Sequence, residues 1–316
     1  MVNRLRPRAA IKMRLTPGSL WLTLRQRFGH GLRAAWYRDV VRPRILQTPP
    51  VTGTTDKTAE IHVLTSAHDW LNLMWTLKSF YAASQRHFAL CIHADRSLPP
   101  EAQQALMTHF PQARVISRAA ADARMAQVLK DYPRCLHFRD TNLLAPKVFD
   151  FIAYLEADRM ALFDSDLLFF SQPTEYLRRV EDRDYGKNTF NADVATAYTV
   201  TREMVHLHLR MKLHPLINSG LGLVHRDSIR LEWLEDFLSV PGLTEGHFWR
   251  IEQTLFALCS SRYGVELLPE DYTLYFESGL NGRAFRHYNG EIRHLMYREG
   301  LPELVRRGLL KSGAGC

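Results

Sequence analysis

The chain has 316 residues, 46% of them hydrophobic and 23% charged, which allows one large folded domain or two small ones and excludes a wholly disordered protein. Its net charge of +8 is unevenly placed: residues 1–50 hold eleven Lys/Arg and one acid, Asp39, whereas the remainder holds 30 bases and 32 acids. The basic character therefore belongs to an N-terminal arm. A basic arm argues less for nucleic-acid binding than a basic domain face does, so no specific nucleic-acid partner is expected.

The arm predicts a basic amphipathic helix. Apolar residues recur every fourth position with arginines between them. These residues are Leu20, Leu24, Phe28, Leu32, Trp36 and Val40. Two interpretations stay open: an interfacial helix that contacts anionic lipid through residues 15–45, or a helix packed on the main domain with a solvated arginine face. A Pro/Thr/Gly-rich linker follows at 48–58, so we expect an arm and linker over 1–57 and the main domain over 58–316.

The next hundred residues alternate strand patterns with helix patterns. Short apolar strands are predicted at 61–65, 88–93, 113–116 and 160–163, and helices at 70–83, 99–110 and 144–155. Such alternation predicts an α/β fold with a mainly parallel sheet and helices on both faces.

Membrane-spanning and secretory signals are not expected. No stretch approaches the ~20 apolar residues that a spanning helix needs, and residues 15–24 lack a cleavage pattern. The four cysteines are widely spaced and form neither a disulfide framework nor a zinc motif. We therefore expect a cytoplasmic protein, with a peripheral position at the inner membrane face if the arm binds lipid.

Two carboxylates interrupt an apolar run. Asp164 and Asp166 follow the strand at 160–163 and precede a second apolar stretch. Side by side in apolar surroundings they would repel each other and lose hydration, and a divalent cation removes both penalties. Hard oxygen ligands suit Mn²⁺ or Mg²⁺, and open α/β sheets bind ligands where strands end. The alternative is a turn whose acids face water.

Here the sequence resembles the GT-A glycosyltransferases, most closely family eight, which includes glycogenin and lipopolysaccharide galactosyltransferases. The similar segments appear in the family's order over about residues 60–300. They are Lys-Val-Phe-Asp-Phe-Ile-Ala-Tyr-Leu at 147–155, Arg-Met-Ala-Leu-Phe-Asp-Ser-Asp at 159–166, Ile-Asn-Ser-Gly-Leu-Gly at 217–222, Glu-Gln-Thr-Leu-Phe at 252–256 and His-Tyr-Asn-Gly-Glu-Ile-Arg at 287–293. The resemblance implies a GT-A fold, and the arm has no counterpart in it.

The resemblance also implies how the metal and the diphosphate are held. His287 is expected as the third metal ligand beside Asp164 and Asp166. Gly290 would let the backbone approach the donor diphosphate, and Arg293, where the family has lysine, would neutralise it.

Further residues are implied for the donor. Lys147 is expected to reach the donor sugar or phosphate, although a solvated helix lysine is the alternative. The nucleoside is expected at the end of the first strand, where helix capping is the alternative, and the sugar beside the Asn-Ser-Gly segment, where Gly220 leaves it room. The expected donor-binding set is Thr65, Ser66, Asp69, Lys147, Ser165, Asn191, Asp193, Asn218, Ser219, Gly220, Gly290 and Arg293, with Asn191 and Asp193 in a polar loop.

Gln253 and Glu252 are the expected catalytic residues. By resemblance Gln253 lies nearest the reacting carbon, and an amide there would orient and stabilise an oxocarbenium-like transition state. This sequence has Glu252 and Thr254 where the family has two aspartates. We expect that difference to affect the acceptor chemistry more than the donor chemistry.

The predicted function is metal-dependent transfer of a hexose, with retention, from a nucleotide diphosphate sugar to a hydroxyl of a glycan, lipid or protein. UDP-sugar is the expected donor. One alternative is a sugar nucleotidyltransferase, although the loop at 65–69 lacks the glycines that such enzymes use for a triphosphate. Another is a non-catalytic binding protein that acts through the basic arm at membranes or nucleic acid.

Overall fold

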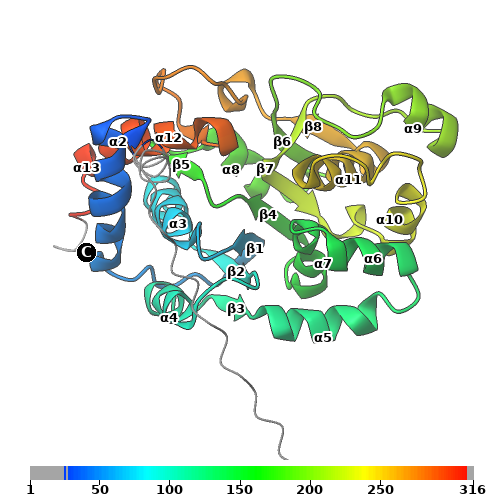
Figure 1. The fold of residues 1–316 in the computed structure, drawn as a ribbon, viewed down its shortest axis with the longest axis horizontal. Coiled ribbons are helices and arrows are strands. Elements are labelled where there is room, and N and C mark those ends of the chain that lie inside the picture. Colours follow the sequence, from blue (N-terminus) through cyan, green and yellow to red (C-terminus); the bar gives the residue numbers. More distant parts are fainter. Residues whose placement is uncertain (1–24, 26–27, 312–316) are drawn as a thin grey trace, which may run out of the picture.

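A computed structural model describes Arg25 and residues 28–311 (Figure 1). Its centre is a seven-stranded sheet with the order β3-β2-β1-β4-β7-β6-β8, and a two-stranded sheet pairs β5 with β9. The strands are β1 (Asp56–Thr65), β2 (Phe88–Ala94), β3 (Arg114–Ile116), β4 (Arg159–Phe163), β5 (Leu167–Phe169), β6 (Asn188–Ala192), β7 (Ile217–His225), β8 (Val265–Leu267) and β9 (Phe285–His287).

Most neighbouring strands of the large sheet run parallel. β3, β2, β1 and β4 are parallel to one another, β7 is antiparallel to both β4 and β6, and β8 is parallel to β6. The α/β prediction with a mainly parallel sheet is therefore confirmed, and β7 is the reversed strand.

Helices cover both faces of this sheet. They are α3 (Trp70–Ser84), α4 (Pro100–His109), α5 (Arg118–Val128), α6 (Pro133–Thr141), α7 (Ala145–Tyr154), α8 (Thr174–Glu181), α9 (Arg202–Leu209), α10 (Leu231–Phe237), α11 (Phe248–Tyr263), α12 (Arg293–Leu295) and α13 (Leu301–Arg306). Successive residues of β4 show the two layers: Ala161 and Phe163 belong to one buried cluster with α3, whereas Met160 and Leu162 belong to another with α7 and α11. Side chains along a strand alternate between faces, so each cluster fills one side of the sheet.

The predicted elements between 61 and 163 match observed ones, with small shifts at their ends. The largest shift is at β1, which begins at Asp56 and so extends into the predicted linker. α5 and α6 fill a stretch for which no helix was predicted.

The described part of the predicted arm is helical and packs on the domain. After Gly31, whose φ is 92°, come α2 (Leu32–Trp36), the π-helical turn η1 (Tyr37–Val41) and the 3₁₀ turn η2 (Arg42–Gln47). Ala34 and Ile45 are buried in the same cluster as α3. Leu20 and Leu24 of the predicted apolar stripe lie outside the described residues. Among the helices that the structure describes, none combines the length and apolar character needed to cross a membrane.

Candidate active site

Three predicted metal ligands converge. The Nε2 atom of His287 lies 3.2 Å from Oδ1 of Asp166 and 3.6 Å from Oδ2 of Asp164. Potential ligand atoms of the three side chains all lie within 4.8 Å of one another. Asp166 and His287 are buried, and Asp164 is partly exposed, so the triad opens to solvent on one side. Two carboxylates and one imidazole form a ligand set suited to a divalent cation such as Mn²⁺ or Mg²⁺.

Strand pairing explains how His287 reaches Asp164 and Asp166, which lie 123 and 121 positions earlier in the sequence. β4 ends at Phe163, and the amide of Asp164 still donates to the carbonyl of Gly220 in β7 (2.8 Å). The chain then turns into β5, whose Leu167 is in register with His287 of β9. The amide of Tyr288 donates to the carbonyl of Asp166 (2.9 Å), so backbone bonds hold both aspartates.

Asn218 and Gly220 position the His287 ring. Nδ1 of His287 lies 3.2 Å from Oδ1 of Asn218, and a hydrogen bond donated there leaves the Nε2 lone pair directed at the two aspartates. A Cβ added at Gly220 would lie only 2.2 Å from the His287 ring. The room that Gly220 provides is thus taken by this ring, whereas the sequence suggested room for the sugar.

The electrostatics of His287 follow from the same neighbours. Burial lowers the pKa of His287, but the carboxylates of Asp166 and Asp164 outweigh it and raise the pKa overall. Burial raises the pKa of Asp166, and His287 and Arg293 more than offset that and lower it. The two carboxylates therefore favour positive charge at the ring nitrogen that faces them, whether a proton or a divalent cation supplies it.

Arg293 bridges two predicted regions of the site. Its Nη2 lies 2.7 Å from Oδ2 of Asp166 and its Nη1 lies 3.0 Å from Oδ1 of Asp69. Its buried Nε has no hydrogen-bond partner among the described residues. The guanidinium therefore connects the metal triad to the start of α3.

Lys147 is a buried site residue. Its Nζ lies 2.8 Å from Oδ1 of Asp164 and 2.9 Å from Oε1 of Glu252, and it donates to the carbonyl of Ser219 (3.2 Å). The hydroxyl of Ser219 in turn donates to Oε2 of Glu252 (3.0 Å). Burial raises the pKa of Glu252 to about 7 despite the opposing charge of Lys147. The alternative of a solvated helix lysine is wrong, because Lys147 is 3% exposed.

Gln253 belongs to a buried amide and carboxylate cluster. Its Nε2 donates to Oδ2 of Asp193 (3.3 Å), and the Asn218 amide donates to the same oxygen (3.2 Å). Asp193 directly follows the end of β6. Asn191, expected in a polar loop, lies instead within β6, where its Oδ1 accepts from the amide of Leu221 across a register shift. A bulge leaves backbone donors without their strand partner, and the Asn191 side chain accepts from one of them. Its Nδ2 is buried and has no hydrogen-bond partner among residues 28–311.

The end of β1 forms a tight polar turn. Ser66 Oγ accepts from the amides of His68 and Asp69 (both 3.2 Å) and donates to Oδ2 of Asp69 (3.1 Å). Asp69 occupies the N-cap position of α3 without a side-chain capping bond, because its carboxylate is directed to Arg293. Thr65 Oγ1 is buried and lacks a hydrogen-bond partner in the described chain. Ser165, between the two aspartates, is also buried.

A cavity of about 250 Å³ lies beside Arg293. Gly290 faces open space there, since a Cβ at this position would meet nothing within 4 Å. The lining is rich in cationic and imidazole side chains from three separate segments. It comprises His30, Ala34, Arg38, Arg42, His68, Gly290, Glu291, Arg293, His294 and Tyr297. His30, Arg38 and Arg42 were not predicted as site residues, because the arm has no counterpart in the family that the sequence resembles, and His294 was missed because it lies just beyond the similar segment at 287–293.

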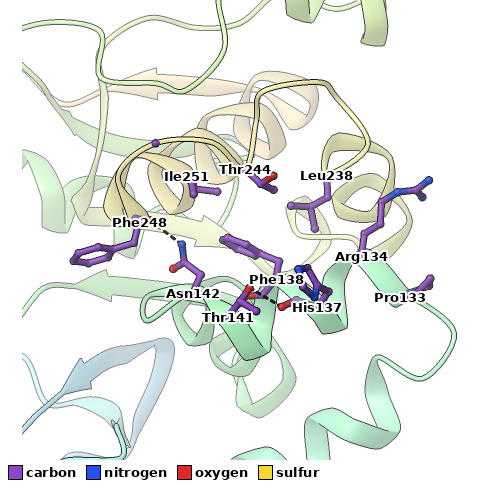
Figure 2. Close-up of a pocket in the computed structure, with 11 residues that line it drawn as sticks. Pro133, Arg134, His137, Phe138, Thr141, Asn142, Leu238, Thr244, Phe248 and Ile251 are labelled. Atoms are coloured by element: carbon purple, nitrogen blue, oxygen red, sulfur yellow. Dashed lines mark hydrogen bonds between the residues drawn. The ribbon is translucent and has the colours of Figure 1, made fainter.

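A larger cavity of about 620 Å³ lies between α6 and the start of α11 (Figure 2). Phe138 and Ile251 line it, and the side chain of Asn142 donates to the carbonyl of Phe248 at its edge (3.1 Å). The residues around it in the described chain include none of the predicted site residues.

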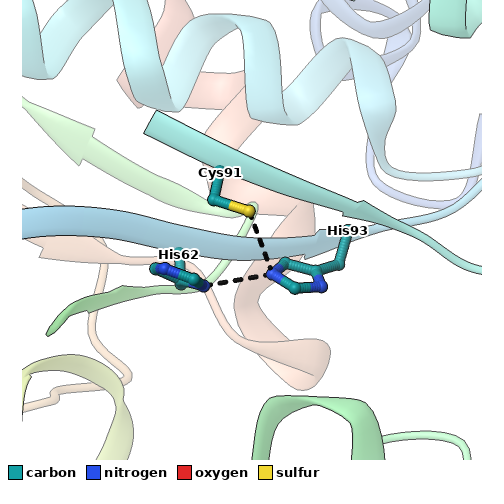
Figure 3. A group of neighbouring side chains, drawn as sticks. All are labelled: His62, Cys91 and His93. Atoms are coloured by element: carbon teal, nitrogen blue, oxygen red, sulfur yellow. Dashed lines mark hydrogen bonds between the residues drawn. The ribbon is translucent and has the colours of Figure 1, made fainter. Parts of the chain in front are cut away.

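A second histidine cluster is buried within the main sheet (Figure 3). His62 Nδ1 lies 3.0 Å from His93 Nε2, and Cys91 Sγ lies 3.4 Å from the same nitrogen. Burial raises the pKa of the Cys91 thiol to about 12 and lowers the pKa of both histidines. His62 Nε2 also lies 3.2 Å from Glu60. With neutral imidazole rings and a protonated thiol, the three side chains form a hydrogen-bonded network in the core, and we assign no metal or other ligand to it.

Comparison with solved structures identifies the fold. The galactosyltransferase LgtC, solved with donor and acceptor sugar analogs, matches with a TM-score of 0.52 and 12% identity over 81% of this chain and 97% of the LgtC chain. The chain has the GT-A fold predicted for it. Apo mouse xyloside xylosyltransferase 1 gives a TM-score of 0.48 at 12% identity, covering 74% of this chain and 98% of that one. Core-mannan synthase A from Aspergillus fumigatus, in its Mn/GDP form, gives 0.43 at 11% identity, with 70% and 75% covered. No family model matches the sequence, and neither does any curated protein.

Proposed function

We propose that this protein is a metal-dependent glycosyltransferase that moves a hexose from a nucleotide diphosphate sugar, a UDP-sugar, to an acceptor hydroxyl with retention. The observation that carries the proposal is the convergence of Asp164, Asp166 and His287 beside a cationic cavity in a GT-A fold. An anionic diphosphate and a divalent cation are complementary to these two neighbouring features.

The side chains present fit a divalent cation. Asp164, Asp166 and His287 would hold it, and the Asn218 contact to Nδ1 is the outer hydrogen bond that metal-binding histidines commonly make. When bound, Mn²⁺ or Mg²⁺ stabilises the negative charge of a leaving diphosphate. The close packing of Gly220 against the ring shows that the histidine has little freedom to leave this position.

Protein residues supply the remaining functions. Arg293 donates to donor phosphate oxygens in exchange for one of its present carboxylate contacts. Lys147 holds Glu252 and Asp164 together, and Glu252 and Gln253 border the sugar. Gln253 contacts the carboxylate of Asp193, and Lys147 contacts that of Glu252. The oxygens of these two carboxylates already accept hydrogen bonds from amides, a hydroxyl or an ammonium group. This supports front-side attack by the acceptor over attack by a free carboxylate nucleophile.

A sugar nucleotidyltransferase is the second candidate. It would also use a metal, but it would release pyrophosphate from a nucleoside triphosphate and a sugar phosphate. The turn after β1 is closed by Ser66 and Asp69 side-chain bonds and contains no glycine, which gives no backbone cradle for a triphosphate. Product analysis separates the two enzymes, because a transferase releases the nucleoside diphosphate.

The decisive experiment is Mn²⁺-dependent hydrolysis or transfer measured across a panel of nucleotide sugars. Wild type should release UDP, and Asp166→Asn and His287→Ala should lose most of that activity. Asp131→Asn, a change at an exposed acid outside the site, is the matched control. Equal activity of wild type and both site variants would refute the metal site. A failure of every nucleotide sugar to bind would refute the transferase proposal.

We also propose that the protein acts in the cytoplasm at the inner membrane face, through residues 15–45. The acceptor hydroxyl then belongs to a glycan, a lipid or a protein that can reach that face.

A further inference from the structure

The helical segment at 28–45 presents an apolar stripe to solvent. Leu32 is 76% exposed, Trp36 50% and Val40 52%, and Phe28 at the start of the segment is 39% exposed. Their spacing of four places them on one side of the helical turns. Such a row of large apolar side chains is unusual on the surface of a protein that has no partner there.

The opposite side of the segment is fastened to the domain. Ala34, Ala35, Val41 and Ile45 are each at most 5% exposed. Trp75 in α3 donates from Nε1 to the carbonyl of Arg42 (2.9 Å). The exposed stripe therefore cannot turn inward without breaking the buried side.

Polar contacts of the segment fix the same orientation. Arg42 donates from Nη1 to Oδ1 of Asn72 (3.0 Å) and to the hydroxyl of Tyr297 (3.3 Å). The rings of His30 and His294 stack with centroids 4.1 Å apart. These contacts join the segment to α3 and to the stretch that carries Gly290 and Arg293, so the stripe is a rigid outward surface of the molecule.

The basic residues around the stripe indicate what kind of partner this surface binds. Residues 1–50 contain eleven basic residues and one acid, and Asp39 is paired with Arg38. Arg33 and Arg44 are exposed next to the stripe. Apolar anchors that include a tryptophan, flanked by arginines, are complementary to the headgroup region of an anionic bilayer.

We propose that Leu32, Trp36 and Val40 insert into the interface of an anionic lipid bilayer while the flanking arginines bind the headgroups. The other side of the same segment lines the cationic cavity through His30 and Arg42. Docking would therefore place the bilayer on one side of this segment and the cavity on the other.

Vesicle flotation of the full-length protein tests the docking directly. Wild type should float with phosphatidylcholine vesicles that contain phosphatidylglycerol, should float poorly with phosphatidylcholine alone, and should dissociate as ionic strength rises. The double variant Leu32→Glu/Trp36→Glu should lower partitioning about tenfold or more, because it replaces two apolar anchors by repelled charges. Leu207→Glu is the matched control, since Leu207 in α9 is 62% exposed and lies outside the stripe.

Each result has a defined meaning. Equal flotation of the double variant and wild type would overturn the proposal, as would a wild type that does not float. A wild-type dimer that the double variant converts to monomer, without flotation of either, would instead make the stripe an interface between copies. Unchanged thermal unfolding confirms that the variant folds. Hydrolysis of a soluble donor without vesicles should stay at the wild-type rate, so loss of docking is distinguishable from loss of the proposed activity.

Discussion

Single atoms decide the geometry of the candidate metal site. The hydrogen of Gly220 lies where any side chain would collide with His287, and Asn218 holds the far nitrogen of the same ring. The two residues orient the imidazole so that one nitrogen faces Asp164 and Asp166. Such supporting contacts affect metal affinity although they do not touch the metal.

Gly220→Ala should therefore weaken Mn²⁺ binding by about 10- to 100-fold, because the new methyl group displaces the His287 ring. Titration calorimetry of the metal measures the change. Gly290→Ala is the contrasting control, because nothing lies within 4 Å of its added methyl group, and it should leave metal affinity unchanged. Unaltered Mn²⁺ affinity in Gly220→Ala would show that His287 is not a ligand.

Glu252 predicts a pH dependence of donor turnover. Burial raises its pKa to about 7, so the carboxylate that contacts Lys147 is present above that pH and is lost as the pH falls below it. Activity should fall by about tenfold per pH unit on the acid side, as expected for one titrating group. Glu252→Gln should be less active and should lack this limb in a pH–rate profile. An identical acid limb in the variant would assign it to another group.

At the scale of elements, the pairing of short strands brings together residues whose proximity no sequence motif predicts. β5 and β9 are three residues each, and their antiparallel pairing carries His287 to the aspartates. β1 and β2 similarly bring His62 and His93 together inside the sheet, in a place that no spacing of these residues in the sequence reveals.

The buried histidine pair predicts how stability depends on pH. Burial lowers the pKa of His62 and His93 in the folded state, so the unfolded chain binds more protons below its ordinary pKa of about 6.5. The free energy of unfolding should therefore fall as the pH drops from 7 to 5, by up to roughly 1.4 kcal/mol per pH unit for each histidine. Urea unfolding at each pH measures this slope.

His93→Gln supplies the comparison, because an amide can hydrogen-bond but cannot take up the proton. The variant should show a shallower loss of stability with falling pH, whereas His208→Gln at an exposed position should keep the wild-type slope. If His93→Gln has the same slope as wild type, the acid sensitivity arises elsewhere.

At the scale of the whole molecule, the segment at 28–47 belongs to the domain on one side and to the surface on the other. The packing on the domain that one interpretation expected is present, and the exposed side carries an apolar stripe besides arginines, whereas the lipid contact of the other interpretation is still a proposal. A truncation that removes residues 1–50 would consequently take away part of the core and would not report on the arm alone.

Matched substitutions within this segment separate the two sides. Ile45→Ala should lower the free energy of unfolding by about 2–5 kcal/mol, because it opens a space in the buried cluster. Leu32→Ala should change it by no more than about 0.5 kcal/mol, because that side chain is exposed. Chemical denaturation of both variants measures the difference. Equal losses would mean that the segment is packed differently.

The sequence by itself determined the fold class, most elements between residues 61 and 163, and the candidate ligands Asp164, Asp166 and His287. Periodicity and the ordered segments are local properties, so they can be read without coordinates. Only the tertiary structure decided that Lys147 is buried against Glu252, that Asn191 lies in a strand, and that Gly220 makes room for His287. Only the tertiary structure shows that Arg42 and His30 line the cavity and that the side chains of Leu32 and Trp36 are exposed. These outcomes depend on contacts between distant segments, and on which side of a helix finds a partner, neither of which periodicity contains.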